Sequence, residues 1–426
     1  MHVRPRNKRR RAVAVLAVGA LATLGVAACS SSSPKATSQV PAGANQTIVF
    51  ATAGLGAEGA ATIASVKAFE QLHHNIRVTI LPVSTDSTVA QEQEEHYFVA
   101  GAPTPDVVYT DVTWIDAFAR PGWLANLSSF HPDTSAFFPA QVATVKYNGG
   151  IYGMPWFINA EGVYYRTDLI KTPPATISAL VSDARAAMKA DPSLKEGLAF
   201  EGFTYEGAVT AWQSFGAQIG LNDLKNIDTP ANVAALTLMY DAINTYKISP
   251  SAVTGWQESN VQAAWQAGQT PFALNWPYLF YLSEAKGSSL AGKTGWIPFP
   301  NASRQSSLGG DDLAINAKST HQAAAYELIQ YLDKANVQDV RAISSGDPPA
   351  VKSAYNAGLY AKAPYFKQEN AVYSVLAGRP VTPVYAQISV QLQDMISSVL
   401  SGQATPSAAL ATAARVVAQI EQTATS

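Results

Sequence analysis

The chain has 426 residues, of which 47% are hydrophobic and 14% charged, enough for a large core and for two or three domains. Its formal net charge is −2. Without the six basic residues of the first 28 positions, 23 basic and 31 acidic residues remain and the net charge becomes −8, which argues against nucleic-acid binding because that needs a basic patch.

The first 28 residues have the pattern of an export signal. A basic segment, 1–11, precedes an uncharged run, 12–28, that is shorter than the ~20 residues of a spanning helix. Cys29, the only cysteine, follows two alanines and resembles the lipobox cysteine of bacterial lipoproteins. The resemblance implies cleavage before Cys29, lipidation of its sulfur and anchoring to the outer face of the cytoplasmic membrane. An uncleaved anchor helix is the alternative, and the sequence leaves Sec or twin-arginine export open.

The segment after Cys29 predicts first a tether and then an α/β domain. Residues 29–46 are rich in Ser, Ala and Pro and are expected to be flexible. Strands and helices then alternate, with predicted strands at 47–50, 77–81 and 106–109 and predicted helices at 60–72 and 92–100. Ile63, Val66, Phe69 and Leu72 are expected on one face of the first helix. This order indicates right-handed βαβ units and a mostly parallel sheet.

The second half of the chain predicts another α/β lobe. The stretch 149–156, which begins with Gly-Gly-Ile-Tyr-Gly, interrupts the pattern. The predicted elements after it are a strand at 163–166, a mainly helical region at 177–288, a strand at 308–316, and helices at 322–332 and 387–420. We therefore expect two α/β lobes, with a chain that crosses between them more than once.

One motif suggests a dinucleotide, but its context does not fit. Gly54, Gly56 and Gly59 match G-x-G-x-x-G between a predicted strand and helix. The acidic residue required at the end of the second strand is missing, so NAD is not expected. Glu58 in this turn could instead reach a neutral ligand. The chain also has no H-E-x-x-H and no G-x-S-x-G, and we expect no catalytic residue, metal or cofactor.

Five segments in order resemble family 1 extracellular solute-binding proteins, the sugar receptors of bacterial ABC importers. The first is Asn-Gly-Gly-Ile-Tyr-Gly-Met-Pro-Trp at 148–156 with Val-Tyr-Tyr-Arg-Thr-Asp-Leu at 163–169. The others are Asn-Trp-Pro-Tyr at 275–278, the strand start at 308–316, Asp-Pro-Pro-Ala-Val at 347–351, and Arg-Pro-Val-Thr-Pro-Val-Tyr at 379–385. The likeness extends from about 47 to 390 and is nearest to the trehalose-binding lipoproteins of actinobacterial importers.

The resemblance implies a two-lobed periplasmic-binding-protein-like α/β fold, with a multi-strand hinge and a ligand cleft between the lobes. Chain crossings are expected near 155–159, 306 and 348. The predicted domains are a signal peptide at 1–28, a tether at 29–46, an N-terminal lobe at 47–157 and 307–349, and a C-terminal lobe at 158–306 and 350–426. Hinge closure around the ligand is expected. The implied partners are a neutral disaccharide or oligosaccharide and the permease subunits, and the protein is expected to be a monomer.

The resemblance and the residue chemistry single out eight ligand-binding candidates: Glu58, Asp111, Asn159, Glu206, Trp276, Tyr278, Gly310 and Arg379. Charged and amide groups replace the hydration of sugar hydroxyls, and aromatic faces cover the C–H side of the ring. The planar fork of Arg379 suits two adjacent hydroxyls. Asp311-Asp312 stands where the family often has a Trp, and these acids either bind hydroxyls or are solvated.

Seven of the eight candidates, all except Glu58, also have a local explanation that the sequence leaves open. Asp111 is a possible helix N-cap, Asn159 and Gly310 possible turn residues, Glu206 a carboxylate at a helix start, Trp276 and Tyr278 possible core residues, and Arg379 a possible salt bridge between lobes. Pro277 argues against a helix between the two aromatics.

The sequence therefore predicts a lipid-anchored, non-enzymatic receptor that delivers a neutral disaccharide, trehalose first, to an ABC permease. A receptor for maltose, malto-oligosaccharide or another solute is the nearest alternative. A secreted glycan-acting enzyme, with Asp111 and Glu206 facing one glycosidic bond, is the alternative from another class.

Overall fold

The computed structural model describes residues 38–54, 56–220, 224, 226–301 and 303–425. Cys29 and the predicted signal peptide lie outside these residues, and so does the first half of the predicted tether, 29–37. No helix in the described ranges is long and apolar enough to cross a membrane.

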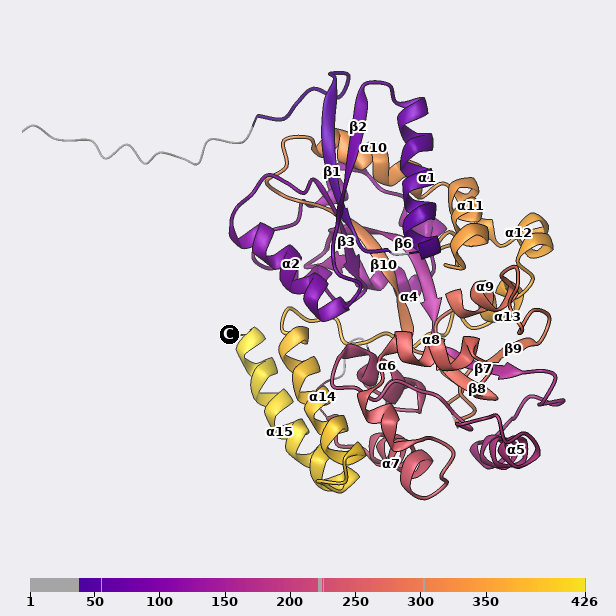
Figure 1. The fold of residues 1–426 in the computed structure, drawn as a ribbon. Coiled ribbons are helices and arrows are strands. Elements are labelled where there is room, and N and C mark those ends of the chain that lie inside the picture. Colours follow the sequence, from indigo (N-terminus) through magenta and orange to yellow (C-terminus); the bar gives the residue numbers. More distant parts are fainter. Residues whose placement is uncertain (1–37, 55, 221–223, 225, 302, 426) are drawn as a thin grey trace, which may run out of the picture. The chain divides into compact units, whose positions relative to one another are not determined.

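A five-stranded sheet with the order β2-β1-β3-β10-β6 organises the N-terminal lobe (Figure 1). Its strands are β1 (Gln46–Thr52), β2 (Ile76–Pro82), β3 (Val107–Asp111), β6 (Gly153–Ala160) and β10 (Leu308–Ile315). Strand β1 runs parallel to β2 and β3, whereas β10 is antiparallel to β3 and β6. Strand β6 therefore runs in the same direction as β1, β2 and β3, and the expected mostly parallel sheet is confirmed for these four strands. Strand β10 alone runs the other way, because it comes back from the other lobe rather than through a βαβ unit.

Helices and short elements cover this sheet. They are α1 (Gly56–Leu72), α2 (Ser87–Val99), α3 (Ile115–Ala119), α4 (Pro139–Thr144), α10 (Gln322–Leu332), α11 (Ala335–Ser345), the 3₁₀ turns η1 (Leu127–Phe130) and η2 (Thr134–Ala136), and the ribbon β4 (Lys146–Tyr147) and β5 (Gly150–Ile151). Helix α2 begins earlier than predicted because Asp86 caps it, accepting from the N–H groups of Thr88 and Val89.

The predicted apolar face of α1 is only half correct. Val66 and Phe69 are buried, but Ile63 is 45% and Leu72 66% exposed. Four positions spaced by three drift around a helix, since each step falls about 60° short of a full turn. The face through Val66 and Phe69 continues instead through Thr62 and Ser65, which are both buried.

A three-stranded antiparallel sheet, β8-β7-β9, lies in the C-terminal lobe. Its strands are β7 (Gly162–Arg166), β8 (Phe272–Asn275) and β9 (Thr294–Ile297). The helices are α5 (Ile177–Ala190), α6 (Glu206–Ser214), α7 (Pro230–Asn244), α8 (Glu258–Gln266), α9 (Tyr278–Glu284), α12 (Ala357–Lys362), α13 (Phe366–Asn370), α14 (Tyr385–Leu400) and α15 (Pro406–Thr425), with 3₁₀ turns η3 (Ser251–Gly255) and η4 (Lys352–Ala354).

Two sequence expectations for this lobe have different outcomes. The helical region expected at 387–420 is confirmed as a pair of helices, α14 and α15, because a turn at 401–405 separates them and Pro406 opens α15. Pro277 does not prevent a helix, since α9 begins at the next residue. A proline is tolerated at a helix start because the first N–H groups have no partner within the helix.

Separate cores stabilise the two lobes. Phe50 and Phe69 are fully buried in the N-terminal core, and Trp212 and Phe272 in the C-terminal core. Burying each such side chain stabilises the fold by about 1.5–3 kcal/mol.

The three segments where chain crossings are predicted make backbone contacts with one another or with the segment at Ala377. The Ile158 N–H donates to the Pro348 carbonyl (3.1 Å), and the Leu308 N–H donates to the Ala377 carbonyl (2.8 Å). Phe157 forms a bridge with Pro349. These are the places where chain crossings are predicted, and the lobe boundaries given above stay a prediction.

Candidate functional site

Asp111 is the last residue of β3, at the carboxyl edge of the parallel strands. Its Oδ1 accepts from the Thr113 N–H (2.9 Å) and hydroxyl (2.7 Å), which shapes the turn into α3. Asp111 is not the N-cap of α3, because Trp114 holds that position without a side-chain bond. Its Oδ2 is free of the turn and accepts from Arg379 Nη2 at 3.0 Å.

Glu206 and Arg379 meet Asp111 at this edge. Arg379, in the loop between α13 and α14, donates through Nη1 to Glu206 Oε1 (2.7 Å) while Nη2 binds Asp111. Glu206 begins α6 and also accepts hydroxyl hydrogen bonds from Tyr385 and Ser389. We call this group the ion triad, Asp111–Arg379–Glu206. It includes three of the eight predicted site residues.

The ion triad is largely buried, with side-chain exposures of 2% for Arg379, 14% for Glu206 and 17% for Asp111. Burial lowers the pKa of Arg379, but Asp111 and Glu206 outweigh this and raise it above the ordinary value. Arg379 therefore stays cationic at any physiological pH. Its Nε has no partner among the described residues. The local explanation of Arg379, a salt bridge, corresponds to its ion pairs with Asp111 and Glu206.

Three further candidates lie on strand β10 or next to it. In its pairing, Gly309 lies opposite Asn159, Gly310 opposite Ile158, and Asp311 opposite Asp111. The Trp276 ring lies over Gly309, since a Cβ at that glycine would come within 2.6 Å of the ring. Asn159, Gly310 and Trp276 thus lie along the strand that also leads to Asp111. The amide oxygen of Asn159 is buried without a partner in the described chain.

Gly310 is a strand residue, not a turn residue. Its φ is +107°, and a Cβ there would lie 2.2 Å from the Phe157 carbonyl oxygen. Only glycine fits this backbone, so its place in the sequence is explained by packing alone.

Glu58 belongs to a second ion group. Near the start of α1 it accepts from Arg341 Nη2 (3.3 Å), which also binds Asp347 at 3.0 Å. The Arg341 guanidinium lies over the rings of Trp156 and Phe157, 4.3 Å from each centroid. Burial, with the nearby Asp347, raises the pKa of Glu58 to about 7, against the opposing effect of Arg341.

Tyr278, half-buried at the start of α9, faces a group of glutamates that sequence reasoning missed. Burial raises the pKa of Glu258, and a hydrogen bond from Tyr278 opposes the rise. Glu201 has both carboxylate oxygens buried without a partner among the described residues. Burial raises the pKa of Glu161 to about 8, although its Oε2 accepts from Ser214 at 2.5 Å. At neutral pH Glu161 is therefore largely protonated and able to donate a hydrogen bond.

A sequence signal for the missed acids does exist. Glu201 stands within an otherwise apolar run, Leu198 to Phe203, and Glu161 stands within Ile158 to Val163, where Asn159 is the only other polar residue. Acids in such runs are expected to be buried and hence functional or neutralised. The interpretation of Asp312 as a solvated acid is wrong, because Asp312 is fully buried and accepts a hydrogen bond from the Thr144 hydroxyl at 3.0 Å.

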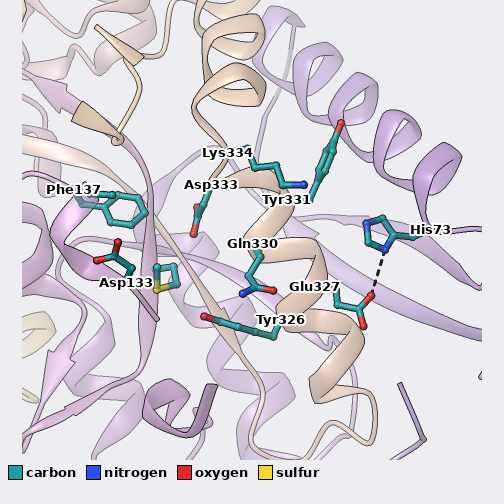
Figure 2. A pocket seen from close by; sticks show the side chains of 11 residues that line it. His73, Asp133, Phe137, Tyr326, Glu327, Gln330, Tyr331, Asp333 and Lys334 are labelled. Atoms are coloured by element: carbon teal, nitrogen blue, oxygen red, sulfur yellow. Dashed lines mark ion pairs between the residues drawn. The ribbon is translucent and has the colours of Figure 1, made fainter. Parts of the chain in front are cut away.

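Two pockets lie away from the predicted residues. One of about 430 Å³ is in the N-terminal lobe, next to α10 and η2 (Figure 2). The other, about 340 Å³, lies between α14 and α15. None of the eight candidates lines either pocket. The described residues contain no group of three His, Cys, Asp or Glu side chains able to hold a metal ion.

Comparison with solved structures defines the class of fold. The maltose-bound structure of MalE3 from T. maritima superposes with a TM-score of 0.81 and 31% identity, covering 87% of this chain and 98% of that one. The GacH receptor of Streptomyces glaucescens gives a TM-score of 0.79 at 23% identity, covering 88% and 98%. The chain therefore has the two-lobed periplasmic-binding-protein fold.

Sequence comparison adds the family. The model of the bacterial extracellular solute-binding proteins matches residues 53–339. A protein of Deinococcus radiodurans named "Probable ABC transporter-binding protein" is 31% identical over 372 residues, covering 82% of this chain and 87% of its own. The chain belongs to the family of bacterial extracellular solute-binding proteins. These relatives are binding proteins rather than enzymes.

Proposed function

We propose that the protein is the lipid-anchored receptor of an ABC sugar importer and captures a neutral disaccharide, with trehalose as the first candidate. The observation that carries the proposal is the ion triad. Asp111 from the sheet of one lobe and Glu206 from a helix of the other bind a single guanidinium. A ligand bound to these three groups would contact both lobes at once, which is what a receptor that closes by a hinge requires.

The chemistry around the ion triad favours hydroxyl groups. Arg379 and Asn159 each keep a buried polar atom without a partner among the residues that the structure describes, and a sugar supplies such partners. Glu161, largely protonated at neutral pH, can donate as well as accept. The Trp276 ring offers an apolar face for ring C–H groups. A neutral ligand is favoured because the cation in the ion triad is already balanced by two carboxylates.

A glycosidase is less well supported. Asp111 and Glu206 are both held by Arg379, so neither is placed as the proton donor that such a reaction needs. The same pair suits recognition of hydroxyls, which accept from arginine and donate to carboxylates.

Maltose is the second candidate ligand. MalE3, 31% identical over most of the chain, was solved with maltose. Trehalose and maltose carry the same hydroxylated rings and differ in linkage, so the choice depends on how the two rings are oriented about the Trp276 ring.

Calorimetric titration of the purified protein with trehalose, maltose and related sugars tests the proposal. We expect one binding site, trehalose as the tightest ligand, and a loss of more than about tenfold in affinity, ~1.4 kcal/mol, in Trp276→Ala. No heat and no thermal shift with any di- or oligosaccharide would exclude the proposed function.

A further inference from the structure

The pocket of about 430 Å³ in the N-terminal lobe is separate from the ion triad and has no role in the proposed function. It is formed where the second half of α10 meets η2 and β6, and its lining includes Phe137, Met154, Tyr326, Gln330 and Asp333. Its volume lies within the ~300–1,000 Å³ of small-molecule sites.

Asp333 is the unusual group in this pocket. Both of its carboxylate oxygens are buried, and neither has a hydrogen-bond partner among the described residues. An unsatisfied buried polar group costs about 1–3 kcal/mol, which a ligand with hydrogen-bonding groups would recover. Figure 2 shows the Asp333 and Gln330 side chains extending from the α10 side of the pocket toward the side of Phe137 and Asp133.

The other charges in the pocket are already paired. The His73 ring lies 3.3 Å from Glu327, and Asp133 accepts from the Ser135 hydroxyl at 2.6 Å. The Lys334 ammonium lies 5.4 Å from the centroid of the Tyr331 ring, which is the position that a cationic ligand would occupy there. Burial, with the neighbouring Asp312, raises the pKa of Asp333 well above its ordinary value. A neutral Asp333 both donates and accepts a hydrogen bond, as a hydroxyl partner requires.

We propose that this pocket is a second ligand site, specific for a small neutral polyhydroxylated molecule of monosaccharide size. Hydroxyls of the ligand exchange hydrogen bonds with Asp333 and Gln330. The apolar side of the ligand lies against Phe137 and Met154, which supply a ring and a polarisable thioether.

Methyl NMR of protein labelled at the methionine methyl groups tests this site with D-glucose as the probe. Met154 lines the pocket, whereas Met239 is buried in the core of the other lobe and serves as the internal control. We expect D-glucose to shift the Met154 signal to saturation and to leave Met239 unchanged. About 100 mM glucose is far above the dissociation constant of a ~1 mM site. If the Met154 signal does not shift at glucose concentrations up to that value, the proposal is overturned.

Two substitutions of Asp333 test whether hydrogen bonding by its side chain accounts for glucose binding. Asp333→Asn keeps a donor and an acceptor and should hold glucose affinity within about threefold, whereas Asp333→Leu should lose at least about tenfold. If Asp333→Leu does not fold, Gln330→Leu on the exposed surface of α10 should weaken glucose binding by at least about threefold.

Ethanolamine is the competing probe, because an ionised Asp333 would select an ammonium. A Met154 shift with ethanolamine but not with glucose, or equal glucose binding by wild type and both leucine variants, contradicts the proposal. Either result leaves the transport function untouched, because sugar binding at the ion triad is measured separately by calorimetry.

Discussion

Replacing Arg379 by Ala removes the one cation that Asp111 and Glu206 share. In the sugar complex we expect the guanidinium to bind ligand hydroxyls. A hydrogen bond to a charged group contributes about 1.5–3 kcal/mol. Losing one such bond corresponds to a fall in trehalose affinity of about 10- to 150-fold, at ~1.4 kcal/mol for each factor of ten.

The same substitution also lowers the free energy of unfolding. Removing one partner of a buried ion pair costs about 3–5 kcal/mol, because the other charge is left uncompensated. Asp111 and Glu206 keep 17% and 14% exposure, so solvent and the Tyr385 and Ser389 hydroxyls offset part of this cost. We therefore expect a loss of about 2–3 kcal/mol in the absence of ligand.

Calorimetry and thermal unfolding measure the two effects in the same preparation. Arg415→Ala is the matched control, since Arg415 is exposed on α15 and donates to the neighbouring Thr412 hydroxyl at 3.3 Å. We expect Arg415→Ala to keep the trehalose affinity and the free energy of unfolding of the wild type. Trehalose affinity within about threefold of wild type in Arg379→Ala, with an unchanged midpoint of unfolding, would refute the role of the ion triad.

Three further predictions concern other parts of the molecule. Gly309→Ala places a methyl group 2.6 Å from the Trp276 ring and should lower sugar affinity by about tenfold, whereas Gly255→Ala, with open space around it, should not. Burial raises the pKa of Glu369 to about 8 from 4.5, so the folded state holds this proton more tightly than the unfolded chain, and stability should fall as the pH rises from about 4.5 to 8. Urea unfolding of Glu369→Gln should show a smaller fall in the free energy of unfolding over that pH range than wild type shows. An equal fall would contradict the assignment of this pH dependence to Glu369. Cys29→Ser should move the protein from the membrane fraction to the medium, as immunoblotting of fractions would show, and retention in the membrane would instead indicate an uncleaved anchor.

The sequence was sufficient to predict the fold class, and it points to the edge of the sheet where the ion triad lies. Asp111 follows a short apolar strand, and the carboxyl end of such a strand is where open α/β sheets bind ligands. The contacts of Arg379 were beyond sequence reasoning, because 268 residues separate it from Asp111 and 173 from Glu206. The alternative of a salt bridge between lobes was stated for Arg379, but its partners were not.

Local signals failed where tertiary packing decided the outcome. The spacing of Ile63 and Leu72 suggested burial, yet both are exposed because only one side of α1 faces the sheet. Arg341 gave no signal in the sequence, since a basic residue in a helix is usually solvated, yet it lies buried against Trp156 and pairs with Glu58. The placement of the eight candidates as ligand contacts remains a prediction.

A crystal structure of the trehalose complex would show directly whether the ion triad binds the sugar. We expect one sugar between the lobes, with hydroxyls within hydrogen-bond distance of Asp111 and Arg379 and one ring on the Trp276 face. A sugar bound at any other place, with the Asp111–Arg379–Glu206 contacts unchanged from those of the unliganded protein, would contradict it.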